Sequence, residues 1–222
     1  MVTFLAPRLD ILPAPQRALW PELRQLPPSF VLYGGTAIAL RLGHRASLDF
    51  DFFSSQPFEV AHLMQTVSWL AAGEVLQSQR NTFTVIVGRS GPVKVSFFGG
   101  LSIGRVGLPQ TTSDHVIGVA SLLDLAATKL AVIQQRAEKR DYLDLAALMK
   151  AGVRLADALG AARALYGERF NPMISLKALS YFRDGDLPSL PETTQQDLAL
   201  AAAEVTEIPP TVRASDSIAI EV

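Results

Sequence analysis

The pattern of apolar and polar positions along the chain changes character near residue 111. Before that point, short apolar runs and alternating segments predict strands at 30–33, 48–53, 75–77, 82–87 and 93–98. Helical spacing between them predicts helices at 17–26, 36–42 and 60–72. After residue 111, helical spacing alone remains and predicts helices at 121–135, 141–150, 155–166, 175–182 and 194–205.

This change predicts an α+β chain with two domains and a tail. We expect an α/β domain with a mixed sheet over residues 1–110, a helical domain over 111–208 and a tail over 209–222. Apolar residues make up 49% of the 222 residues, which is enough for a sizeable core. Charged residues make up 18%, and that balance argues against a largely disordered chain.

Charge and composition exclude several classes of function. The formal net charge of −1 argues against bulk nucleic-acid binding, although a local basic patch stays open. The absence of cysteine excludes disulfides and zinc–thiolate sites. The chain starts with no leader-like segment and contains no apolar run long enough for a membrane span, so a cytoplasmic protein without a membrane partner is expected.

Two acidic residues, Asp49 and Asp51, alternate with Phe50 and Phe52 in the predicted strand at 48–53. Residues two apart in a strand point to the same face, so the two carboxylates are expected side by side and the two rings in the core. Carboxylates this close repel each other, and a divalent cation relieves the repulsion. Mg²⁺, or Mn²⁺ in its place, suits such a pair when phosphate oxygens complete its ligands.

The residues Gly34, Gly35 and Thr36 join a predicted strand to a predicted helix. Glycines let the backbone approach a phosphate closely, and the start of a helix presents free N–H groups. Arg45 and Ser47 lie just before the acidic strand, where Arg45 could hold phosphate or steady a carboxylate. A glycine pair by itself is usually a tight turn, and an Asp-x-Asp motif by itself usually lies on a solvent-exposed edge of a sheet. The two motifs together favour a metal–nucleotide site.

The same residues carry a resemblance to a known family. The block Gly34-Gly35-Thr36-Ala37, His44-Arg45, Ser47 and Asp49-Phe50-Asp51 resembles the first motif of the AbiEii/AbiGii toxin family of nucleotidyltransferases. A second stretch is similar to the helical motifs of that family; it comprises Asp124 to Lys129, Arg136, Arg140-Asp141 and Asp144-Leu145. The resemblance extends over residues 30–149.

The resemblance implies a polymerase-β-like nucleotidyltransferase domain followed by a helical domain. It implies transfer of a nucleotide from an NTP with loss of pyrophosphate, in a toxin whose relatives include modifiers of tRNA acceptor ends. A cognate antitoxin protein is the partner that it implies. Two alternatives stay open: nucleotidyl transfer to a small molecule, and a catalytically decayed module that binds a nucleotide or an antitoxin.

Lys129 and Asp141 are further candidates for catalysis. Lys129 falls on an apolar stripe of the helix predicted at 121–135, where an ammonium is costly unless a phosphate or carboxylate partners it or it extends to water. Asp141 is a candidate because the resemblance points to it, whereas a pair between Arg140 and Asp144 at helical spacing would be ordinary surface decoration.

One position departs from the pattern of polymerase-β-like enzymes, many of which carry a third carboxylate on a later strand. The strand predicted at 93–98 places Lys94 and Ser96 on one face, and if that face is the one that meets the two carboxylates, Ser96 takes that position. Lys94 could bind phosphate or simply face solvent. The enzyme could work with two carboxylates, recruit Asp141 or Asp144, or be weak or inactive.

If the acceptor is RNA, we expect a basic surface beside the metal–nucleotide site. The arginines that could form it are Arg41, Arg45, Arg80, Arg89 and Arg105.

Overall fold

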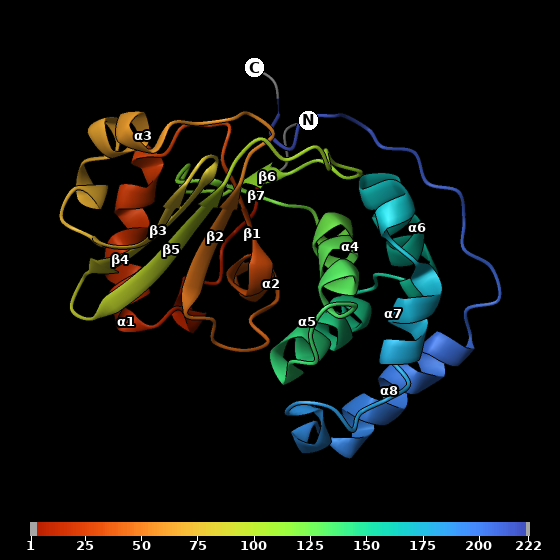
Figure 1. Ribbon diagram of the computed structural model, residues 1–222. Coiled ribbons are helices and arrows are strands. Elements are labelled where there is room, and N and C mark those ends of the chain that lie inside the picture. The colour runs from red at the N-terminus through yellow and green to blue at the C-terminus, as the bar shows by residue number, and fades with distance from the viewer. Residues whose placement is uncertain (1–3, 221–222) are drawn as a thin grey trace. The chain divides into compact units, whose positions relative to one another are not determined.

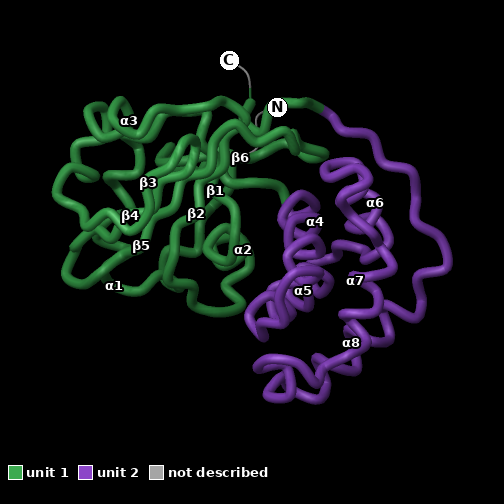
Figure 2. The backbone as a smooth tube through the Cα atoms, in the orientation of Figure 1, with its two compact units in different colours: residues 1–121, 215–222 green, residues 122–214 purple. Residues whose placement is uncertain are grey.

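The computed structural model describes residues 4–220 (Figure 1). The chain folds into two compact units (Figure 2). The first unit holds the chain up to Ser121 and again from Ser215, and the second holds Leu122–Ala214. The first contains the sheet and the second contains helices (Figure 2). The mixed α+β architecture predicted from the sequence is therefore confirmed.

The first unit is built on a seven-stranded mixed sheet in the order β3-β4-β5-β2-β1-β7-β6. β2 pairs in parallel with β5 and β1 in parallel with β7, while the other neighbours are antiparallel. The strands are β1 (Val31–Tyr33), β2 (Asp49–Phe53), β3 (Glu74–Gln79), β4 (Thr82–Gly88), β5 (Pro92–Phe98), β6 (Gln110–Thr111) and β7 (Gly118–Val119). The acidic strand β2 thus lies in the middle of the sheet (Figure 1).

Alternation along the strands gives the sheet one apolar face. Phe50 and Phe52 of β2 are fully buried, and the ring of Phe52 stacks on that of Phe97 with centroids 5.5 Å apart. Phe83 continues the row of buried rings on β4. The short helix α1 (Ala14–Leu19) contacts β5, and the 3-10 turn η3 (Ser68–Leu70) contacts β4. This unit also contains η1 (Leu9–Ile11), η2 (Trp20–Gln25) and α3 (Val60–Thr66).

The helix α2 (Gly34–Leu42) follows β1 directly and ends at Gly43, whose φ of 65° is left-handed. Arg41 near its end donates hydrogen bonds to the backbone oxygens of Ala120 and Val119, at 2.8 and 3.0 Å, and to Oε1 of Gln110 at 2.7 Å. Burial lowers the pKa of Arg41 to about 10. Arg41 therefore ties α2 to β6, β7 and the residue after β7, which fixes the helix beside the sheet.

The second unit consists of helices α4 (Leu122–Val132), α5 (Lys139–Lys150), α6 (Leu155–Tyr166), α7 (Pro172–Ala178) and α8 (Glu192–Ala203), with short turns η4 (Gly167–Arg169) and η5 (Leu187–Ser189). Helix α6 has the predicted bounds. Helix α7 begins at Pro172, which suits a first helical position, and Asn171 caps it, its side chain accepting from the N–H of Met173 at 3.0 Å.

The units differ from the expected domain ranges in two places. The sheet extends to Thr111 of β6 and to the whole of β7, which were expected in the helical domain. The end of the chain, expected as a tail, returns to the first unit, where Ser215 forms a bridge with Arg105. Arg105 also donates to the carbonyl of Ala219 at 2.7 Å, and Ala219 is buried. Both differences come from backbone pairing between segments distant in sequence, which local periodicity does not encode.

Candidate active site

Gly34 and Asp51 lie against each other at the junction of β1 and α2. Tyr33 pairs with Asp51 across the antiparallel strands, which brings the start of the helix beside the carboxylate. A Cβ built on Gly34 would lie 2.6 Å from Oδ2 of Asp51. The φ of Gly34 is 72°, a left-handed value that favours glycine. Strand pairing and glycine together place a carboxylate at the first turn of α2.

Gly35 is the point of closest approach for two further predicted site residues. A Cβ on Gly35 would lie 2.6 Å from Nη2 of Arg45 and 3.0 Å from Oγ of Ser47. Nη1 of Arg45 also donates to the carbonyl of Ala46 at 2.9 Å, so the loop itself orients the guanidinium. The Gly35 backbone, which carries no side chain, therefore lies next to the Arg45 guanidinium, the Ser47 hydroxyl and the start of α2. This arrangement suits an anion such as phosphate.

Thr36 contributes structure at this site. Its side chain is buried, and its Oγ1 donates to the backbone carbonyl of Asp49. This bond fastens the first turn of α2 to the start of β2. The sequence prediction that Thr36 binds nucleotide therefore rests on its backbone N–H, because the hydroxyl is engaged in the fold.

Asp49 lies next to Lys94, its register partner on β5. Nζ of Lys94 is 3.8 Å from Oδ2 of Asp49, and the side chains are 46% and 31% exposed respectively. The predicted orientation of Lys94 toward the acidic face is confirmed. A pair this open is weak, so both groups can turn to a bound ligand at little cost.

Ser96 stands beside Asp51 where a third carboxylate was expected. It pairs with Asp51 on one side and with Thr84 of β4 on the other, so the three share one face of the sheet. Ser96 is 3% exposed. The structure therefore places a buried hydroxyl, and no acid, next to Asp51 on the neighbouring strand.

The donor set fits a magnesium ion that is completed by substrate. Asp49 and Asp51 lie on the same face, two residues apart, and both are partly exposed. No group of three or more His, Asp or Glu side chains within residues 4–220 is placed to hold a metal ion. Mg²⁺ is commonly bound by one or two carboxylates together with phosphates and water, so two carboxylates beside a phosphate cradle suffice.

Lys129, on α4 of the second unit, lies between two buried carboxylates of α5. Its Nζ is 2.6 Å from Oδ1 of Asp141 and 2.6 Å from Oδ2 of Asp144. The carboxylate side chains are 0% exposed and the lysine side chain 8%. Of the alternatives that the sequence left open for Lys129, the structure shows carboxylate partners, and there are two of them. The cluster joins α4 to α5 by charge-assisted hydrogen bonds.

Asp141 also accepts from Arg136, whose Nε lies 2.8 Å from Oδ2. Burial alone would raise the pKa of Asp141, but the hydrogen bond from Arg136 and the charge of Lys129 outweigh it and lower the pKa. The suggested pair between Arg140 and Asp144 is wrong: Arg140 binds Glu138 at 2.6 Å. The Arg140 side chain is 53% exposed, whereas that of Asp144 is buried against Lys129.

The suggested arginine surface is largely absent, because three of its five members hold the fold. Arg41 binds backbone carbonyls, and Arg105 binds the returning end of the chain. Arg89 forms a two-pronged pair with Glu22, at 2.6 and 2.9 Å. Arg45 approaches the carboxylate site, through Gly35. Sequence gives no signal that separates a surface arginine from one engaged by distant backbone.

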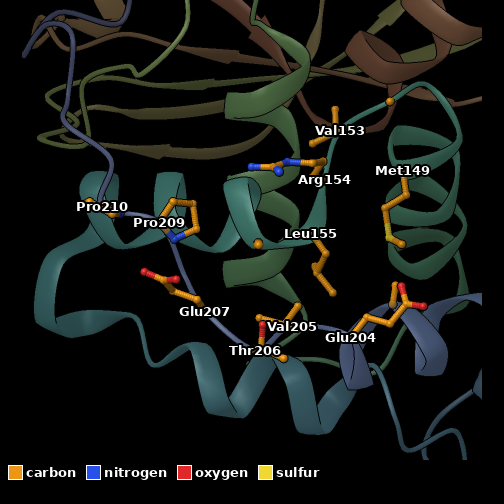
Figure 3. Close-up of a pocket in the computed structure, with 13 residues that line it drawn as sticks. Met149, Val153, Arg154, Leu155, Glu204, Val205, Thr206, Glu207, Pro209 and Pro210 are labelled. Atoms are coloured by element: carbon orange, nitrogen blue, oxygen red, sulfur yellow. The ribbon is translucent and has the colours of Figure 1, made fainter.

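A pocket of about 680 Å³ opens in the second unit between the end of α5, the start of α6 and the segment after α8 (Figure 3). Its polar lining includes Glu204, Glu207 and Arg154. The guanidinium of Arg154 donates two hydrogen bonds to the carboxylate of Asp157, from Nε at 2.7 Å and from Nη2 at 2.6 Å. Two carboxylates and a neutralised arginine disfavour phosphate, so this pocket is a poor nucleotide site.

Among the described helices, none has the length and apolar character needed to cross a bilayer.

Comparisons with known proteins bear on the family and the fold of the chain. A model of the family described as "Nucleotidyl transferase AbiEii toxin, Type IV TA system" matches residues 17–219. An uncharacterized protein of Aquifex aeolicus (strain VF5) is 32% identical over 158 residues, covering 70% of this chain and 74% of that protein. The structure titled "Crystal structure of putative nucleotidyltransferase from H. pylori" aligns with a TM-score of 0.54 at 18% identity. The alignment covers 85% of this chain and 90% of that one, and it supports the fold.

Proposed function

The chain belongs to the AbiEii family of nucleotidyl transferase toxins of type IV toxin–antitoxin systems, and we propose that it transfers a nucleotide from an NTP to RNA with Mg²⁺. The acceptor that we propose is tRNA, in the cytoplasm, and the partner a cognate antitoxin. The observation that carries the proposal is the contact between Gly34 and Asp51, because it joins a phosphate-binding helix start to a metal-binding carboxylate.

Substrate binding is assigned to the residues around Gly35. The N–H groups of the first turn of α2, the Arg45 guanidinium and the Ser47 hydroxyl hold the β- and γ-phosphates of the NTP. Lys94 leaves Asp49 and approaches the triphosphate, whose charge exceeds that of one carboxylate. These residues fix the triphosphate so that its α-phosphorus lies at the two carboxylates.

Asp49 and Asp51 would hold the metal ion. When bound, Mg²⁺ supplies charge neutralisation at the phosphate oxygens in the transition state. The acceptor hydroxyl oxygen bonds to the α-phosphorus, the bond from that phosphorus to the bridging oxygen breaks, pyrophosphate leaves and the hydroxyl proton passes to water. Ser96 is neutral at pH 7 and is no base, so positioning and charge neutralisation must carry the rate.

Lys129 and Asp141 remain predicted catalytic residues. Their burial and mutual pairing favour a positioning role, in which they hold α4 and α5 in place. Lys129→Arg separates the two roles, because it keeps the positive charge for the carboxylates but moves the nitrogen atoms. If Lys129 is catalytic, the Lys129→Arg protein should remain folded but lose transfer activity.

The test is incubation of the purified protein with total RNA and each labelled NTP in turn, with and without Mg²⁺. The proposal expects label on RNA, only with Mg²⁺. Label on small molecules alone would support the alternative acceptor. If calorimetry detects NTP binding but no acceptor is labelled, the buried Ser96 favours the decayed nucleotide-binding module instead.

A further inference from the structure

Two phenylalanine rings lie on the face of the sheet that carries the catalytic carboxylates. Alternation along β2 places Asp49, Asp51 and Phe53 on one face, and all three are partly exposed. Phe53 pairs in register with Phe98 of β5, which is also partly exposed. Their ring centroids are 5.5 Å apart at an interplanar angle of 83°. We name these two rings the aromatic shelf.

The aromatic shelf lies on the face of the sheet opposite the buried phenylalanines of the core. The core takes the opposite face, where Phe50, Phe52 and Phe97 are fully buried. On the shelf side, Tyr33 stacks on Phe53 with centroids 4.6 Å apart and an interplanar angle of 10°. Tyr33 is 1% exposed, so a fixed ring supports Phe53 while part of the shelf stays open to solvent. Large apolar groups exposed beside a polar site often mark a binding surface.

The order of groups along β2 indicates what binds there. Ser47 and Arg45 come just before the strand, at Gly35; Asp49 and Asp51 follow, and Phe53 comes last. Strands rise about 3.3 Å per residue, so Phe53 starts about 7 Å beyond Asp51. A triphosphate held at the Arg45 end, with its α-phosphorus at the carboxylates, directs its ribose and base toward Phe53.

We propose that the aromatic shelf of Phe53 and Phe98 binds the base of the NTP by stacking. This inference rests on the proposed function. Base–aromatic stacking tolerates every base, because each has a π-face. The shelf therefore supplies affinity to all four NTPs and leaves the choice among them to other groups. The terminal base of the acceptor could occupy the shelf instead. In that case the base of the NTP would lie on the other side of the carboxylates, away from Phe53.

The test compares NTPs with inorganic triphosphate, which has no base. Wild-type protein, Phe53→Ala and Phe98→Ala are titrated with each NTP and with inorganic triphosphate, in Mg²⁺ and without RNA, by calorimetry. Phe4→Ala is the matched control, since Phe4 is an exposed phenylalanine whose ring packs against His115, which is not a residue of the proposed site. Thermal unfolding verifies that each variant is folded, and Phe53→Leu replaces Phe53→Ala if it is not.

We expect the shelf variants to lose affinity for all four NTPs on the order of 10- to 100-fold, with unchanged affinity for triphosphate and no change in Phe4→Ala. Unchanged NTP affinity in both shelf variants overturns the inference, as does an equal loss for triphosphate. A raised KM for RNA with normal NTP binding overturns it in favour of the acceptor base. If wild-type protein binds neither NTP nor triphosphate, the proposed function itself fails.

Discussion

Gly34 lies so close to Asp51 that there is no room for a side chain at position 34, since a Cβ there would lie 2.6 Å from the Asp51 carboxylate oxygen. The two residues are far apart in sequence but adjacent through the pairing of Tyr33 with Asp51. A phosphate bound at the first turn of α2 is therefore also at the carboxylate. This relationship makes the glycine as necessary to the proposed chemistry as the acid.

Gly34→Ala is expected to reduce transfer more than it reduces stability. The added methyl meets the carboxylate, and the left-handed φ of 72° costs about 1–2 kcal/mol for a residue with a Cβ. Transfer rates and urea unfolding measure the two effects. Gly88→Ala is the matched control, because a Cβ there meets nothing within 4 Å. Normal transfer by Gly34→Ala would contradict the assigned site.

Asp49→Asn and Asp51→Asn are each expected to lower transfer on the order of 1,000-fold, because each removes several kcal/mol of metal-mediated stabilisation. Without Mg²⁺, neither change should destabilise the fold, since repulsion between the carboxylates is relieved. Single-turnover assays with labelled NTP and circular dichroism check both points. Asp10→Asn, at an exposed residue paired with Arg8, should behave as wild type. Full activity in either site variant would show that the carboxylates are misassigned.

Lys129→Met is expected to destabilise the second unit by about 3–5 kcal/mol, because it leaves buried carboxylates without their ammonium partner. Urea unfolding measures the loss. Lys150→Met is the control: Lys150 is 71% exposed and lies 3.9 Å from Asp197, a pair worth about 0–1 kcal/mol. Similar stability of the two variants would mean that the buried cluster holds the helices only weakly.

Acid is expected to destabilise the protein partly through Asp141. Its pKa is lowered in the folded state, so its contribution to stability is complete above the ordinary carboxyl value near 4 and is lost as the pH falls through the lower folded value. Unfolding free energies between about pH 2 and pH 6 measure this loss. In Asp141→Asn the curve should be flatter in that window, and an unchanged slope would rule out the linkage.

Ser96→Asp is expected to make stability depend more strongly on Mg²⁺. The new carboxylate would stand beside Asp51 in the sheet register, where like charges destabilise each other. The free energy of unfolding should fall without Mg²⁺ and recover with it by more than in wild-type protein. Thermal unfolding with and without Mg²⁺ gives the comparison, with Ser96→Asn as the uncharged control. An equal Mg²⁺ effect in all three proteins would place the metal elsewhere.

Much of the local structure followed from the sequence. The alternation of Asp49 and Asp51 with Phe50 and Phe52 predicted one acidic and one buried face, and burial confirms both. The same period in β5 correctly placed Ser96 on the acidic side. These predictions hold because side chains alternate strictly in a strand, whatever the strand pairs with.

Other features could not be predicted because they depend on partners distant in sequence. Arg41, Arg89 and Arg105 resemble surface arginines in sequence, yet each is engaged by the fold. For Lys129 the sequence left open a phosphate, a carboxylate or an extension to water, and it suggested Arg140 as the partner of Asp144, which instead binds Lys129. Residues three and four apart share a helix face, and helix packing alone decides which of them turns inward.

The sequence by itself determined the chemistry available to this protein: two carboxylates on one strand face, a glycine pair before a helix, and a family whose motif joins them. Local periodicity and residue type suffice for these. Only the tertiary structure decided that Gly34 abuts Asp51, that Gly35 meets Arg45, and that Phe53 extends the acidic row with an open ring. Those contacts depend on strand pairing and loop closure, which arise only when distant segments pack together.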